Sequence, residues 1–80
     1  MKRKYHFKFD KTEGKNFERV IKGLRLKIDT KVKHRIDMET VGYDYIVSLS
    51  KYELLFVGLS CRAGEYVDIT EHNEKSYILA

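Results

Sequence analysis

The chain has 80 residues, of which 42% are hydrophobic and 12% aromatic. That is enough for one small core and too short for two independent domains, so we expect a single domain over 1–80. No apolar run approaches the ~20 residues that cross a bilayer, which excludes a membrane-spanning segment and predicts no membrane partner. The lone Cys61 excludes a disulfide framework and is typical of a reducing compartment.

Charge is distributed unevenly along the chain. Residues 1–36 hold 13 Lys/Arg and 4 Asp/Glu, whereas residues 37–80 hold 3 and 8, and the formal net charge is +4. This asymmetry predicts either an electrostatic partner or two halves that complement each other within the fold. The basic start, 1–10, alternates polar and apolar residues and lacks the continuous apolar segment of a signal peptide. We therefore expect a cytoplasmic protein.

The first two elements are predicted from a change of period. Residues 4–10 alternate and predict an amphipathic strand with its aromatic side chains on one face. Residues 10–23 predict a helix, because apolar residues fall at i, i+3, i+4 and i+7: Phe17, Val20, Ile21 and Leu24. Asp10 and Glu13 have the spacing of a capping box, with Asn16 as the cap of a shorter alternative. Gly23 is expected to end the helix in a left-handed conformation.

Residues 24–39 alternate without interruption, with a charged residue at every odd position. A straight strand of that length would run roughly 50 Å, whereas a domain of this size is about 30 Å across. We therefore predict one long, strongly bent strand that curls around the helix with its even positions inward.

A hairpin is predicted next, with its turn at 41–42 or 39–42. It pairs residues 31–39 antiparallel with 43–49 and leaves Ile46 on the outer face. The residues expected to face the helix side chains Phe17, Val20 and Ile21 are Val32, Ile36, Met38, Tyr43, Tyr45 and Val47.

Residues 51–62 allow two predictions. Ser50 and Glu53 form a capping-box signature and Gly64 suits a helix stop. A short continuous apolar run with Gly58 in its middle favours a strand instead, because Gly costs a helix about 1 kcal/mol relative to Ala. We favour the strand. Residues 65–70 and 76–80 then form a closing hairpin.

Both alternatives are α+β. The first is a single helix packed on an antiparallel meander in the order β-α-β-β-β-β, a shape similar to grasp-type and cystatin-like folds. The second is the ferredoxin-like order βαββαβ. The segment "ETVGY" does not match the Gln-x-Val-x-Gly loop motif of cystatins, so the shape implies no protease inhibition.

The charged positions of the two predicted strands suggest a function. If the strands at 4–9 and 24–39 are neighbours, they place seven Lys/Arg residues and one His on an exposed sheet face. We predict a small non-enzymatic protein that contacts the nucleic-acid backbone with this face. The predicted binding residues are Lys4, His6, Lys8, Arg25, Lys27, Lys31, Lys33 and Arg35.

The alternative is an inhibitor or adaptor of the phage or mobile-element type. Such a protein binds a protein partner, for instance a nucleic-acid-processing complex, through its charge-polarised surface or through an exposed strand edge. The acidic residues available for this role are Asp37, Glu39, Asp44, Glu65, Asp68, Glu71 and Glu74.

Enzyme chemistry has weak support in the sequence. His6 between two lysines suits acid–base work beside a phosphate, as in a small nuclease, but no second catalytic group lies near it in sequence. His34 is expected on the inward face, and Cys61 is expected to be a buried small hydrophobe. Dispersed His and Cys residues lack metal-ligand spacing, and Gly-rich phosphate loops are absent. We therefore predict no catalytic residues, no metal and no cofactor.

Overall fold

Seven helices and strands lie in the part of the chain that the computed structural model describes, residues 1–35, 37–38, 40–61, 65–70 and 75–78. Their order is β-α-β-β-α-β-β. The bounds are β1 Arg3–Asp10, α1 Lys11–Gly23, β2 Thr30–Arg35, β3 Val41–Leu49, α2 Lys51–Ser60, β4 Glu65–Asp68 and β5 Lys75–Ile78.

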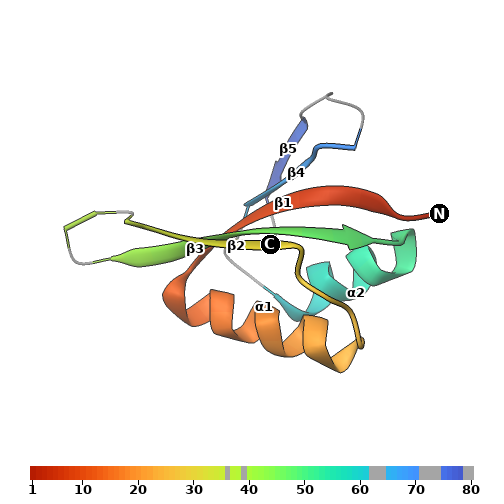
Figure 1. Ribbon diagram of the computed structural model, residues 1–80, viewed down its shortest axis with the longest axis horizontal. Coiled ribbons are helices and arrows are strands. Elements are labelled where there is room, and N and C mark those ends of the chain that lie inside the picture. The colour runs from red at the N-terminus through yellow and green to blue at the C-terminus, as the bar shows by residue number, and fades with distance from the viewer. Residues whose placement is uncertain (36, 39, 62–64, 71–74, 79–80) are drawn as a thin grey trace.

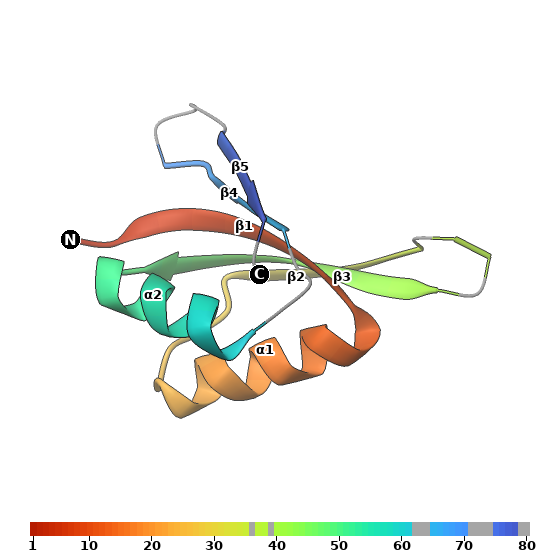
Figure 2. The ribbon, with the colours of Figure 1, turned by 180° about the vertical axis from the view of Figure 1, so that it is seen from behind.

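The strands form one antiparallel sheet in the order β2-β3-β1-β4-β5. Both helices lie on the same face of this sheet, and the other face is open (Figure 1; Figure 2). The predicted α+β class is confirmed. From β1 to β4 the elements follow the ferredoxin-like order βαββαβ, and β5 pairs beyond β4. The arrangement with one helix is replaced, because a second helix follows β3.

Local signals explain α1. The Asp10 carboxylate accepts a hydrogen bond from the backbone N–H of Glu13 at 2.7 Å, as the predicted cap requires. The helix buries Gly14, Phe17 and Ile21 against the sheet. It ends differently from the prediction. The residue with positive φ (58°) is Arg25, while the described glycines have none.

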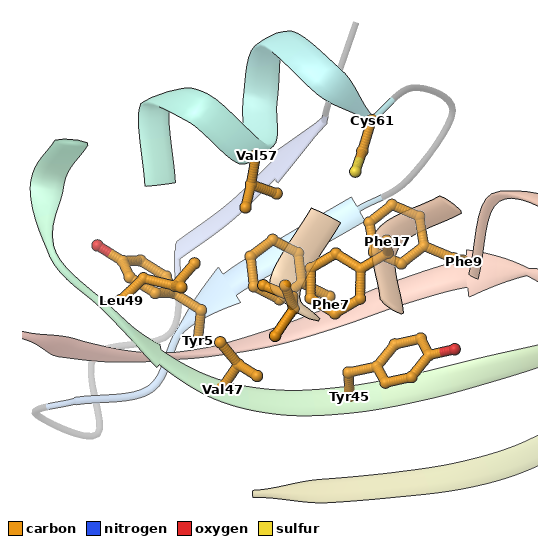
Figure 3. Packing of buried hydrophobic residues seen from close by; sticks show 10 residues of the cluster. Tyr5, Phe7, Phe9, Phe17, Tyr45, Val47, Leu49, Val57 and Cys61 are labelled. Atoms are coloured by element: carbon orange, nitrogen blue, oxygen red, sulfur yellow. The ribbon is translucent and has the colours of Figure 1, made fainter. Parts of the chain in front are cut away.

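The core lies between the sheet and the helices. Alternate residues of β1 (Tyr5, Phe7, Phe9) and β3 (Tyr45, Val47, Leu49) point towards the helices and are buried, as Figure 3 shows. Phe17 of α1 packs against this layer, with its ring centroid 4.8 Å from that of Phe7. Val57 and Cys61 close the core on the side of α2. Burial raises the pKa of the Cys61 thiol to about 11, so it remains a neutral core residue, as predicted.

The long strand predicted over 24–39 is wrong. The molecule measures 39 × 28 × 23 Å, and only Thr30–Arg35 is a strand. Leu24, Leu26 and Ile28 precede that strand and pack against the core as a connection. Pairing of β2 with β3 is confirmed, but Arg35 pairs with Val41 and Lys31 with Tyr45, so neither predicted turn is correct.

This register reverses the predicted faces of β2. Residues directly opposite each other in a sheet share a face. Tyr45 is in the core, so Lys31 lies on the helix side and Val32 on the open side. Val32 is 52% exposed and Met38 is 92% exposed, which contradicts their predicted inward placement. Ile36 lies outside the described residues. Ile46 pairs with His6 on the open face, as predicted.

The preference for a strand over 51–62 is also wrong, because Lys51–Ser60 is the helix α2. Both hydrogen bonds of the capping box form: the Glu53 N–H donates to Ser50 Oγ at 3.2 Å, and the Ser50 N–H donates to the Glu53 carboxylate at 2.8 Å. Their combined stabilisation exceeds the cost of about 1 kcal/mol for Gly58. The closing hairpin is confirmed, with Asp68 paired to Lys75.

Candidate functional site

The eight predicted binding residues do not share one face. Strand β3 separates β1 from β2. Lys4, His6 and Lys8 point to the open face, because their neighbours Tyr5, Phe7 and Phe9 point into the core. Lys31, Lys33 and Arg35 pair with Tyr45, Tyr43 and Val41 and therefore lie on the helix side. Arg25 and Lys27 belong to the connection between α1 and β2.

A cluster of titratable groups occupies the open face. Asp44 of β3 lies between His6 of β1 and His34 of β2. Its Oδ1 is 3.6 Å from His6 Nε2 and 3.5 Å from His34 Nδ1. The sequence analysis placed His34 on the inner face, and the register corrects this. These three residues are far apart in sequence, so only the strand pairing brings them together.

The cluster has limited accessibility. Both separations exceed normal hydrogen-bond lengths. Asp44 Oδ1 and His34 Nδ1 are buried and have no hydrogen-bond partner. Within the described ranges, no group of three or more His, Cys, Asp or Glu residues could hold a metal ion, which fits the placement of the two histidines on opposite sides of Asp44. A carboxylate at the centre also opposes the approach of a phosphate.

On the helix side, Lys31 connects β2 to α1. Its Nζ lies 3.0 Å from Glu18 Oε2 and 4.7 Å from the centroid of the Tyr43 ring. The Tyr45 hydroxyl donates to Glu18 Oε2 at 2.7 Å. Burial alone would raise the pKa of Glu18, but the hydrogen bond from Tyr45 and the Lys31 ammonium lower it below its usual range. Burial and the adjacent carboxylate raise the pKa of Tyr45, so this hydroxyl stays a donor.

Helix α1 adds cations that the sequence analysis did not single out. Lys11, Lys15, Arg19 and Lys22 are all exposed and recur at i, i+4, i+8 and i+11, one stripe of a helix. The buried residues Phe17 and Ile21 lie on the opposite side, so this stripe faces away from the sheet. The helical spacing was visible in the sequence, where the alternating segment 24–39 received the attention.

The stripe continues into the connection and β2. We define the basic surface as the nine Lys/Arg residues of segment 11–35, all of them exposed. The same segment holds three acidic residues, Glu13, Glu18 and Asp29. Among the described residues, Lys31 is the member of this surface that forms an ion pair. The members are Lys11, Lys15, Arg19, Lys22, Arg25, Lys27, Lys31, Lys33 and Arg35.

Part of the acidic half is engaged within the fold. Asp68 Oδ2 accepts a hydrogen bond from Arg3 Nε at 2.6 Å, and Asp44 lies between the two histidines. Glu65 and Asp37 are exposed. Glu39, Glu71 and Glu74 lie outside the described residues.

Helix α2 exposes a second kind of surface. Four large apolar side chains point to solvent: Tyr52 is 80% exposed, Leu55 61%, Phe56 48% and Leu59 75%. We name these four residues the apolar patch. A groove of about 410 Å³ runs beside them, lined by α2 and by Tyr66 of β4.

Comparison with models of protein families, with curated proteins and with solved structures gave no match. Among the described helices, none is long and apolar enough to cross a membrane. The argument for function therefore comes from the surfaces themselves.

Proposed function

We propose that this chain is a small non-enzymatic binding protein that holds the backbone of a nucleic acid on the basic surface. The observation that carries this proposal is the exposed row of cations on α1, continued by Arg25 and Lys27 and by the cations of β2. This surface keeps half of the residues predicted from the strands, adds Lys31, and replaces Lys4, His6 and Lys8 with the helical stripe.

The geometry suits phosphate contact. From Lys11 to Lys22 the helix advances roughly 16 Å at ~1.5 Å per residue. Phosphates of one DNA strand follow each other at ~3.4 Å along the axis, so the stripe covers about five of them. Exposed Lys and Arg side chains neutralise phosphates and release counterions without reading bases. We therefore expect weak sequence preference.

The test reverses the stripe and compares it with an equal change elsewhere. Lys15→Glu, Arg19→Glu and Lys22→Glu combined should weaken DNA binding on the order of 100-fold in fluorescence anisotropy. The matched control combines Lys4→Glu, Lys8→Glu and Lys51→Glu, which are exposed and change the net charge equally. Its binding should fall much less. Equal losses in both variants would show that net charge alone governs binding and would contradict the proposal.

The same samples test the absence of catalysis. The buried Asp44 and His34 atoms on the open face leave little access for a phosphate. RNA incubated with the wild-type protein should remain intact on a denaturing gel. Cleavage that disappears in a folded His6→Ala variant would make the cluster an active site.

A protein partner is the second candidate, and the apolar patch is the observation that favours it. Apolar patches of this kind commonly mark interaction sites. Purification from the source cell with and without nuclease separates the two candidates. Partners that survive nuclease treatment support an adaptor or inhibitor, and loss of all partners supports nucleic-acid binding.

A further inference from the structure

We propose that the apolar patch of α2 is the interface of a homodimer, in which α2 of one copy packs antiparallel against α2 of the second. This inference goes beyond nucleic-acid binding and concerns a different surface. It starts from the four side chains of the patch, which are 48–80% exposed although they belong to one ten-residue helix.

The exposed area is of the right size. Large apolar side chains bury about 150–250 Å² each when they are fully enclosed, so these four expose roughly 400–600 Å² together. The largest apolar patch on a typical monomer is about 300–600 Å² and is often functional. A standard interface takes about 800 Å² from each partner. The patch therefore supplies the apolar centre of a dimer, and the walls of the groove supply its rim.

The patch is self-complementary in shape. Tyr52, Leu55, Phe56 and Leu59 project from α2, and the groove between α2 and Tyr66 lies directly beside them. A twofold interface needs a projection and its receptor on the same surface, because each copy offers both. The absence of a side chain at Gly58, which lines the groove, lets a second helix approach closely.

Charge also fits a second copy. Between residues 50 and 61 the ionisable side chains of Lys51 and Glu53 carry opposite charges, so two copies meet here without cation repulsion from the patch. The last turn of α2 has no basic residue. In an antiparallel pair, Lys51 of each copy lies beside the carbonyl end of the other helix, which favours a cation.

The basic surface stays outside this interface. Lining residues of the groove come from α2 and β4, and none comes from α1. Helix α1 meets α2 on its other side, where Asn16 Nδ2 donates to the Ser60 carbonyl at 2.9 Å. Figures 1 and 2 show the two helices side by side beneath the sheet. Both copies therefore keep their phosphate-binding cations exposed.

Sedimentation velocity over a wide concentration range tests the dimer. We expect a species of about 19 kDa, twice the 9.5 kDa of the chain, that dissociates on dilution. Leu59→Glu should raise the dissociation constant at least about 30-fold, as for a central interface residue. Val32→Glu is the matched control, because Val32 is an exposed apolar residue on the opposite face of the sheet, and it should leave the dimer intact.

Salt separates this proposal from the proposed function. Added salt should strengthen the dimer, since each copy carries +4, but should weaken nucleic-acid binding. A wild-type protein that stays at 9.5 kDa at every concentration overturns the dimer, whether or not DNA binds. Leu55→Glu, at a second exposed position, repeats the test if Leu59→Glu fails to fold. A monomer that co-sediments with phosphatidylglycerol vesicles through Leu55 and Leu59 also overturns it, in favour of a lipid surface.

Discussion

Arg25 occupies a backbone conformation that usually belongs to glycine. Its φ is 58°, and the backbone N–H groups of Arg25 and Leu26 donate to the carbonyls of Lys22 and Ile21, which together close the end of α1. A residue with a Cβ pays roughly 1–2 kcal/mol for this region. The position is kept for a cation in the middle of the basic surface.

Arg25→Gly should therefore raise the free energy of unfolding by about 0.5–1 kcal/mol, measured by chemical denaturation. Gly23→Ala provides the comparison. Gly23 has no positive φ and an added Cβ meets nothing within 4 Å, so this change should also stabilise α1. A destabilised Gly23→Ala protein would mean that the helix ends at Gly23, as its sequence suggested.

Glu18 gives the fold a defined acid dependence. Its folded pKa lies below the ordinary value of 4.5, so the folded state binds this proton more weakly than the unfolded state does. The resulting stabilisation is present above about pH 4.5 and is lost as the pH falls through the folded pKa. Glu18→Gln should lower stability at neutral pH and flatten the acid limb of a stability–pH curve.

Part of that limb should survive in the variant. The backbone N–H of Ser50 lowers the pKa of Glu53. At Asp68, burial raises the pKa, but hydrogen bonds from Thr70 and Arg3 lower it overall. An acid limb identical to that of the wild type would contradict the role assigned to Glu18.

At the scale of elements, α2 depends on its first turn. Most of its side chains are apolar on every side, so a burial pattern alone does not define it as a helix. The reciprocal hydrogen bonds of Ser50 and Glu53 supply that definition. Ser50→Ala should cost about 1 kcal/mol in thermal or chemical unfolding. Ser60→Ala, at the other end of α2, should change stability little, and equal losses in both variants would contradict the capping role.

The elements show which sequence signals were sufficient. Cap, apolar stripe and length all lie within α1, so local reasoning predicted that helix. In segment 24–39 the alternation is real, but its phase reverses between Ile28, which packs on the core, and Val32, which is exposed. Alternation cannot report such a reversal, because pairing with β3 decides it.

The candidate site shows the same limit. Lys11, Lys15, Arg19 and Lys22 were recognisable as one helical stripe from their spacing alone. His6, Asp44 and His34 were not recognisable as a cluster, because their proximity follows from the registers of two different strand pairs. Long-range pairing, rather than local propensity, positions the open face.

At the scale of the whole molecule, the two surfaces divide the chemistry. The basic surface spans α1 and β2, and the apolar patch lies on α2. The uneven charge along the chain is partly satisfied internally, since Arg3 pairs with Asp68 and Lys2 lies 3.6 Å from Glu53. The cations of segment 11–35 remain largely unpaired within the described residues and are available for an anionic partner.

The measurement that tests this account most directly is the salt dependence of binding to double-stranded DNA, followed by fluorescence anisotropy. If five to seven cations of the basic surface neutralise phosphates, the slope of log K against log salt should be about −4 to −6. Lys15→Glu, Arg19→Glu and Lys22→Glu combined should bring that slope close to zero. A wild-type slope near zero, or a slope that the triple variant leaves unchanged, would contradict the assignment of this surface to nucleic acid.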